Sequence, residues 1–364
     1  MTITYEEFYR TLKPQGDPVA DAVVTELLDS GQVENVNKLF RAFATADEGV
    51  PAGASPILRD YLESTRKFPD WVDKTKLADT DEFFKHHKTP AAAVQATAGL
   101  VGTYLSPMGA KTLHSAHKLD RPARRLSQST RLFMGMGDND AFGPKSKLLP
   151  TCQKVRLVHA AIRQLHLRSG KWDVEGDGMP VSLLYTAGAM LVFSVGTLDA
   201  MARIGVATTK REQEGYFYAW RIIAHWLGIP DDVTDMNVTE GHALWDSARD
   251  HEWAPSEAGA ILTEGCIELY ESYMPPGMKG AVPAFLRQAL SDKYADMVKV
   301  PKSAYDLGAK AGAAGASLLL NTPVTKNVLV QPVLDALGQV VERVGREAFT
   351  ARHETEPQMT DKIE

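Results

Sequence analysis

An uncharged stretch at residues 181–198 constrains the fold more than any other part of this 364-residue chain. Its length lies at the lower limit for a helix that crosses a membrane. Polar and small residues interrupt it, among them Ser182, Thr186 and Gly188, and Asp199 follows at once. We therefore expect a central helix buried among other helices, and no transmembrane segment.

The composition fits a large helical protein. Hydrophobic residues make up 44% of the chain and charged residues 24%, which is ordinary for globular proteins. The net charge is -6 and no long basic run occurs, so nucleic acid is not an expected partner. The sequence has no strand-like alternation and no internal repeat, so the predicted class is all-α. Cys152 and Cys266 stand far apart, and we expect two buried free thiols.

Helix signals divide the chain into predicted segments. A capping box, Thr209-Lys-Arg-Glu212, opens a helix over 210–227, and Gly228 and Pro230 close it. Further helices are expected at 18–30, 33–44, 90–105, 120–136, 152–168, 181–203, 239–251, 257–273, 282–298, 303–321 and 327–346. The expected organisation is an N-terminal helical extension (1–64), a core (65–235), C-terminal helices on the same core (236–350) and a flexible tail (351–364).

The predicted helix 152–168 is apolar on nearly every side yet carries a basic ridge. At about 3.6 residues per turn, one stripe holds Arg156, His159, Arg163 and His166. Valine, leucine, isoleucine and alanine cover most of the remaining surface, as is typical of a buried helix. Buried arginines need anionic partners or a wet cavity.

Two interpretations account for this ridge. In the first, the helix binds heme: His159 is the axial iron ligand, and the propionates pair with Arg156 and Arg163. In the second, His159 is hydrogen-bonded within the core and each arginine pairs with a protein carboxylate. The spacing alone leaves both open.

The segment Arg156-Leu-Val-His-Ala-Ala-Ile-Arg163 resembles the axial-ligand motif of latex clearing proteins (rubber oxygenases) and related MpaB-type oxygenases. Further segments resemble elements of this family in the same order, over residues 65–235. They are Phe68-Pro-Asp-Trp-Val-Asp73, Arg125-Leu-Ser-Gln-Ser129, Gly178-Met-Pro-Val-Ser182 and Tyr216 to Pro230.

The resemblance implies an all-helical, globin-like core that binds heme b. His159 matches the proximal iron ligand, and Arg156 and Arg163 match the arginines that neutralise the propionates or brace the ligand helix. The opposite iron face, open to dioxygen, would lie near Arg125, Gln128 and Ser129, which are the expected catalytic residues.

The chain departs from the family at two positions on that face. Gln128 stands where rubber-cleaving members can carry a lysine ligand. No Asp or Glu occurs between Glu82 and Asp120, where those members carry a glutamate proposed as a base. The polar residues nearby are His114 and His117, which we interpret as surface or supporting residues.

The expected function is therefore a heme b-dependent oxygenase that uses dioxygen on a hydrophobic unsaturated substrate. Isoprenoids and lipids, as small molecules or polymers, are the candidate classes, and Met190, Leu191 and Phe193 are candidate pocket residues. The alternative is a non-catalytic heme-binding or scaffold protein. Residues 1–10 lack a leader pattern, so a cytoplasmic location is expected, with secretion as the alternative. The sequence does not indicate an oligomeric state.

Two other chemistries find little support. A carboxylate-bridged di-iron bundle uses Glu-x-x-His pairs, and no histidine here has an acidic residue three positions before it. A serine nucleophile on a Gly-x-Ser-x-Gly elbow is also missing from the sequence.

Overall fold

Helices form all the regular secondary structure of the described residues, so the predicted all-α class is confirmed. The computed structural model describes residues 3–115, 132–133, 135–138, 140–275, 277–278, 280–306, 330–350 and 358–362. The helices before the first large gap are α1 (Tyr5–Leu12), α2 (Pro18–Asp29), α3 (Val33–Ala42), α4 (Pro56–Ser64), η1 (Lys74–Lys76), α5 (Leu77–Val94), η2 (Gln95–Gly99), α6 (Leu100–Tyr104) and α7 (Pro107–Ser115). Those after it are α9 (Leu148–Ser169), α10 (Val174–Asp177), α11 (Leu183–Phe193), α12 (Val195–Arg203), α13 (Lys210–Trp226), α14 (Asp231–Thr234), α15 (Val238–Glu252), α16 (Glu257–Tyr273), α17 (Ala281–Leu290), α18 (Asp292–Met297) and α20 (Val330–Thr350).

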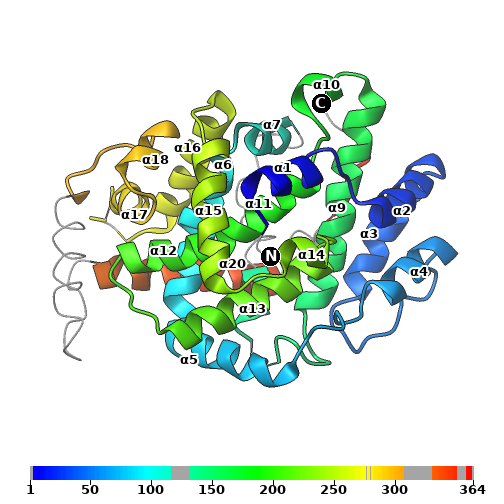
Figure 1. The fold of residues 1–364 in the computed structure, drawn as a ribbon, viewed down its shortest axis with the longest axis horizontal. Helices are drawn as coiled ribbons and strands as arrows, with labels where there is room; N and C mark the ends of the chain where they lie inside the picture. The colour runs from blue at the N-terminus through cyan, green and yellow to red at the C-terminus, as the bar shows by residue number, and fades with distance from the viewer. Residues whose placement is uncertain are drawn as a thin grey trace.

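The uncharged stretch lies at the centre of the fold. Figure 1 shows α11 behind α1, with α9 on one side and α15 on the other. The segment Leu183–Arg203 is long and apolar enough to cross a membrane by length and composition, with a mean hydropathy of 1.4. However, 72% of its most apolar window is buried by the rest of the protein. This burial supports the expected central core helix.

That segment is two helices, where the sequence predicts one over 181–203. The helix breaks at Ser194, whose backbone angles are φ -96° and ψ -92°. Tyr216 of α13 donates a hydrogen bond of 2.6 Å to the carbonyl oxygen of Phe193 at the break. A side chain from another helix therefore satisfies a backbone group at this break. No local sequence signal within the segment predicts the break.

Helix α5 also departs from the prediction, because it begins at Leu77 and runs through Pro90. A proline inside a helix costs about 3 kcal/mol. Helix α5 packs closely along α13, where the Thr80 hydroxyl donates to the Gly215 carbonyl oxygen at 2.7 Å. A Cβ on Gly215 would lie 2.4 Å from the backbone of Asp79, so only glycine allows this approach. The helix continues through Pro90, and η2 follows it as a π-helix.

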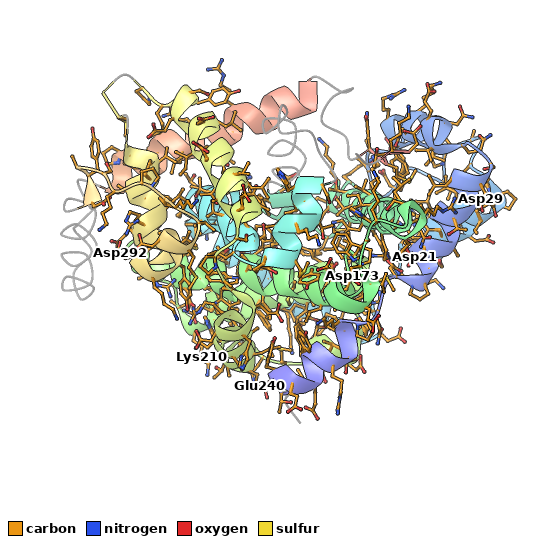
Figure 2. All side chains as sticks on the ribbon, turned by 90° about the horizontal axis from the view of Figure 1, so that it is seen from above. Asp21, Asp29, Asp173, Lys210, Glu240 and Asp292 are labelled. Atoms are coloured by element: carbon orange, nitrogen blue, oxygen red, sulfur yellow. The ribbon has the colours of Figure 1, made fainter. Side chains whose placement is uncertain are left out.

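The N-terminal helices α2, α3 and α4 form a second hydrophobic cluster with one side of α9. Figure 2 shows them at one end of the molecule, with Asp29 of α2 and Asp292 of α18 near opposite ends. Part of the tail expected to be flexible joins this cluster. Met359 is buried, and its backbone exchanges two hydrogen bonds of 2.9 Å with the Asn37 side chain of α3.

Candidate active site

A cavity of about 320 Å³ lies among α6, α7, α9, α11, α13 and α15, with Phe8 of α1 on its wall. Most of the lining is apolar. The predicted pocket residues Met190, Leu191 and Phe193 all contribute to it. Sites for small molecules and cofactors occupy about 300–1,000 Å³ and are mostly apolar with few polar groups. The cavity is therefore the candidate active site.

Gly188 leaves room in this cavity. A Cβ there would meet no atom within 4 Å, whereas one on Gly102 would lie 2.8 Å from Val192. Glycine inside a helix costs about 0.5–1 kcal/mol relative to alanine. At Gly102 the missing side chain allows close helix packing, but at Gly188 it enlarges the open space.

His159 faces the cavity from the middle of α9. Its imidazole makes no hydrogen bond within the described part of the chain. Burial and, to a smaller extent, the positive charge of Arg163 together lower the pKa of His159 to about 4, although Asp17 acts in the opposite direction. The ring is therefore neutral at physiological pH and keeps a nitrogen lone pair, which is the form that ligates a metal.

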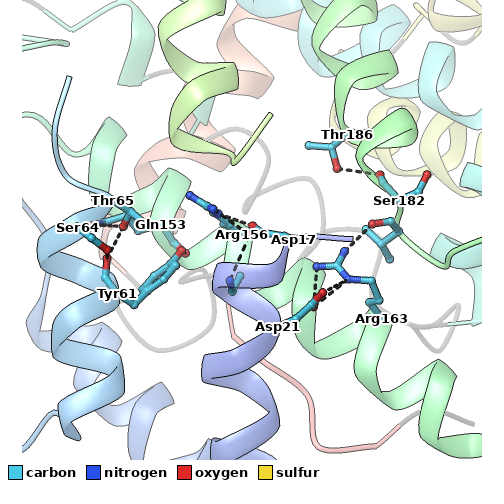
Figure 3. A network of polar contacts seen from close by, with 12 residues as sticks. Asp17, Asp21, Tyr61, Ser64, Thr65, Gln153, Arg156, Arg163, Ser182 and Thr186 are labelled. Carbon is cyan, nitrogen blue, oxygen red and sulfur yellow. Dashed lines mark hydrogen bonds and ion pairs between the residues drawn. The ribbon is translucent and has the colours of Figure 1, made fainter. Parts of the chain in front are cut away.

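The flanking arginines turn away from the cavity toward α2. Arg156 forms a two-pronged ion pair with Asp17, in which one nitrogen lies 2.9 Å from Oδ1. The Nε of Arg163 donates to Asp21 Oδ1 at 2.9 Å, and another nitrogen of Arg163 donates to the Val181 carbonyl oxygen at 2.6 Å (Figure 3). Neither arginine lines the cavity.

The partners of Arg156 and Arg163 in the structure are protein carboxylates, and their pairing with heme propionates stays a prediction. The carboxylates come from α2, which the sequence gives no reason to place beside α9. Two buried ion pairs join α9 to Asp17 and Asp21 at the start of α2. Bracing of α9 is the other role that the family resemblance implies for the two arginines.

His166, the last member of the predicted ridge, also lies outside the cavity lining. Its Nε2 is 3.1 Å from the Ser115 hydroxyl oxygen, and its ring packs against Trp172 with centroids 4.7 Å apart. The cavity instead receives Val155, Val158 and Ile162 beside His159. Its wall is thus the neighbouring apolar stripe of α9, and His159 stands at the border of the two stripes.

The expected catalytic residues Arg125, Gln128 and Ser129 lie outside the described residues, as does His117. His114 belongs to α7 but is not part of the cavity lining. Sequence reasoning missed Arg249 and Glu252 of α15, which do line the cavity. Their spacing of three residues places them one helical turn apart, but nothing in the local sequence distinguishes them from surface charges.

The structure is thus a helical core around an apolar cavity, with an imidazole at the cavity wall that makes no hydrogen bond to a described residue. A comparison with known families gives the class of protein. The chain belongs to the family described as ER-bound oxygenase mpaB/B'/Rubber oxygenase, catalytic domain, whose model matches residues 84–318. This membership confirms the family resemblance and marks the chain as an oxygenase-type oxidoreductase.

Two relatives illustrate the membership. The Rubber oxygenase of Streptomyces sp. (strain K30) is 27% identical over 289 residues, which cover 79% of this chain and 71% of that protein. The solved structure of Latex Clearing Protein LCP in the closed state matches with a TM-score of 0.79 and 23% identity, and covers 90% of each chain. At this identity the structural match supports the fold alone.

Proposed function

We propose that this chain is a heme b-dependent oxygenase that uses dioxygen to cleave or oxygenate a hydrophobic unsaturated substrate of the isoprenoid or lipid type. The observation that carries the proposal is the neutral imidazole of His159, which has no hydrogen-bond partner in the described structure and faces an apolar cavity. Membership of the oxygenase family supports the reaction class.

The residues of the cavity fit heme better than a metal held by protein ligands alone. The described residues contain no group of three or more His, Cys, Asp or Glu side chains arranged to hold a metal ion. Heme needs one axial ligand from the protein, because the porphyrin supplies four nitrogens. His159 would be that ligand, and bound heme would supply the redox chemistry that activates dioxygen.

The chain itself orients the imidazole of His159 and keeps water away from the substrate. The ion pairs of Arg156 and Arg163 with α2 fix the rotation of α9, and so hold the imidazole of His159 toward the cavity. The apolar walls, including Trp220 and Phe193, bind a hydrocarbon chain and exclude water from it. The dioxygen site would lie beside Arg125, Gln128 and Ser129, as the family resemblance implies.

A comparison of two histidine variants tests the proposal. His159→Ala should remove most heme, measured by the pyridine hemochrome absorbance per protein, while the far-ultraviolet circular dichroism stays helical. His166→Ala is the matched control, because it removes an imidazole from the same helix outside the cavity. Full heme retention in His159→Ala would overturn the ligand assignment.

Turnover separates an enzyme from a heme-binding protein without catalysis. The heme-loaded chain should consume dioxygen and give a carbonyl or oxygenated product with an unsaturated isoprenoid. Heme binding without any dioxygen-dependent product from isoprenoid or lipid alkenes would favour the non-catalytic alternative.

A further inference from the structure

The cavity has a polar end on α15. The charged side chains among its described lining residues are Arg249 and Glu252. Arg249 is already neutralised, because one of its nitrogens lies 2.6 Å from Asp246 and another 3.8 Å from Asp199. The guanidinium also lies over the ring of Trp245, 5.5 Å from its centroid. Two carboxylates therefore offset the charge of Arg249, although its buried Nε makes no hydrogen bond within the described structure.

Glu252 differs from Arg249 because it has no cationic partner in the described structure. The Tyr5 hydroxyl donates to its Oε1 at 2.5 Å, and its Oε2 accepts no hydrogen bond from a described residue. A carboxylate has several acceptor positions, so Glu252 keeps unused acceptor capacity at the wall of an apolar cavity.

Tyr185 supplies a second polar group close to Glu252. It lines the cavity from α11, and its hydroxyl has no hydrogen-bond partner among the described residues. Tyr185 and Glu252 line the same cavity from α11 and α15, which pack against each other. Burial raises the pKa of Tyr185 above its usual range, and the negative charge of Glu252 raises it in the same direction. The phenol stays protonated and can both donate and accept.

The surroundings of this end are acidic on balance. The carboxylates are Asp199, Asp246, Asp250 and Glu252. Arg249 pairs with Asp199 and Asp246, Lys293 pairs with Asp250, and the His242 imidazole lies 3.4 Å from Asp199. Lys13 of the α1–α2 connection donates to the Tyr9 hydroxyl and does not line the cavity. An anionic head group beside the partly buried carboxylate of Glu252 would meet an unneutralised like charge, which is unfavourable.

Building on the proposed function, we infer that Glu252 and Tyr185 recognise the hydroxyl end of an unsaturated isoprenoid or lipid alcohol. The alcohol hydroxyl donates a hydrogen bond to Oε2 of Glu252 and accepts one from Tyr185, while its chain extends along the apolar walls. Glu252 repels the carboxylate of the corresponding acid. The site thus selects an uncharged, hydrogen-bond-donating end group.

Calorimetric titration of the heme-loaded protein with farnesol and farnesoic acid at pH 7.5 tests this inference. The two ligands share one unsaturated chain and differ in the end group. The wild type should bind farnesol roughly tenfold more tightly, since a hydrogen bond to a charged acceptor is worth about one decade or more in affinity. Glu252→Gln should reduce the preference to about twofold, and Tyr185→Phe should weaken farnesol binding several-fold.

Tyr5→Phe is the matched control. It removes the hydroxyl that touches Glu252 from α1 but leaves the carboxylate in place, so the preference for the alcohol should stay. Equal affinity of the wild type for both ligands, or an unchanged preference in Glu252→Gln, would overturn the inference and leave the proposed function intact. If neither ligand binds the heme-loaded protein, the cavity is not the substrate site and both proposals fail.

Discussion

The pair formed by Arg163 and Asp21 offers the sharpest test of how α9 is held. The Arg163 side chain is 2% exposed and that of Asp21 is 20% exposed. Removing one partner of a buried ion pair costs about 3–5 kcal/mol, because the other charge is left without compensation. Water reaches part of Asp21, so we expect Asp21→Leu to destabilise the protein by about 3 kcal/mol, at the lower end of that range.

The assay is thermal unfolding followed by circular dichroism at 222 nm, together with heme content. At about 2–4 °C per kcal/mol, the midpoint should fall by about 6–12 °C in Asp21→Leu. The double variant Asp21→Leu, Arg163→Met removes both charges and replaces them with apolar groups. It should recover about 2 kcal/mol relative to the sum of the single effects, because the lone buried charge is gone.

Heme content distinguishes a brace from a cofactor contact. If Arg163 acts only through α2, the double variant should keep nearly all its heme. A loss of heme in the double variant comparable to that in His159→Ala would refute the brace and restore the propionate pairing. A midpoint shift below about 2 °C in Asp21→Leu would refute the energetic reasoning, since the pair would then be worth under 1 kcal/mol.

Three further predictions follow from single sites. Gly188→Ala should raise the free energy of unfolding by about 0.5–1 kcal/mol, because its Cβ enters open space, whereas Gly188→Phe should fill the cavity and weaken farnesol binding in the same titration. Partial burial raises the pKa of Glu212, but hydrogen bonds from Thr209 and His86 outweigh this and lower it to about 2. A lowered pKa in the folded state stabilises the protein above the unfolded value near 4.5, so this stability should disappear as the pH falls toward 2, and Glu212→Gln should flatten that part of the unfolding profile. Cys152 is buried and its thiol pKa is raised by burial, so it should react with Ellman's reagent only after unfolding; rapid reaction of the native protein at both cysteines would contradict its placement.

Local patterns in the sequence determined the helical class and many helix ends. The capping box at Thr209 and the helix over Glu257–Tyr273 agree with the structure because such signals act within one turn of the chain. The basic ridge on α9 and its resemblance to a family motif also singled out His159, which the structure places at the wall of the cavity. These features need only neighbours three or four residues away.

Contacts between segments far apart in the sequence decided the break in the central helix, the partners of the buried arginines and the polar residues of the cavity. The carbonyl group freed at the break before Ser194 is bonded by Tyr216 of α13, and the start of α5 is bonded to Gly215 of the same helix, which lies beyond the range of any local signal. The partners of Arg156 and Arg163 come from α2, about 140 residues earlier, so the sequence could show that the arginines needed anions but not which ones. The place of Glu252 in the cavity lining also depends on tertiary structure, because α15 packs against α11 and brings this carboxylate to the cavity.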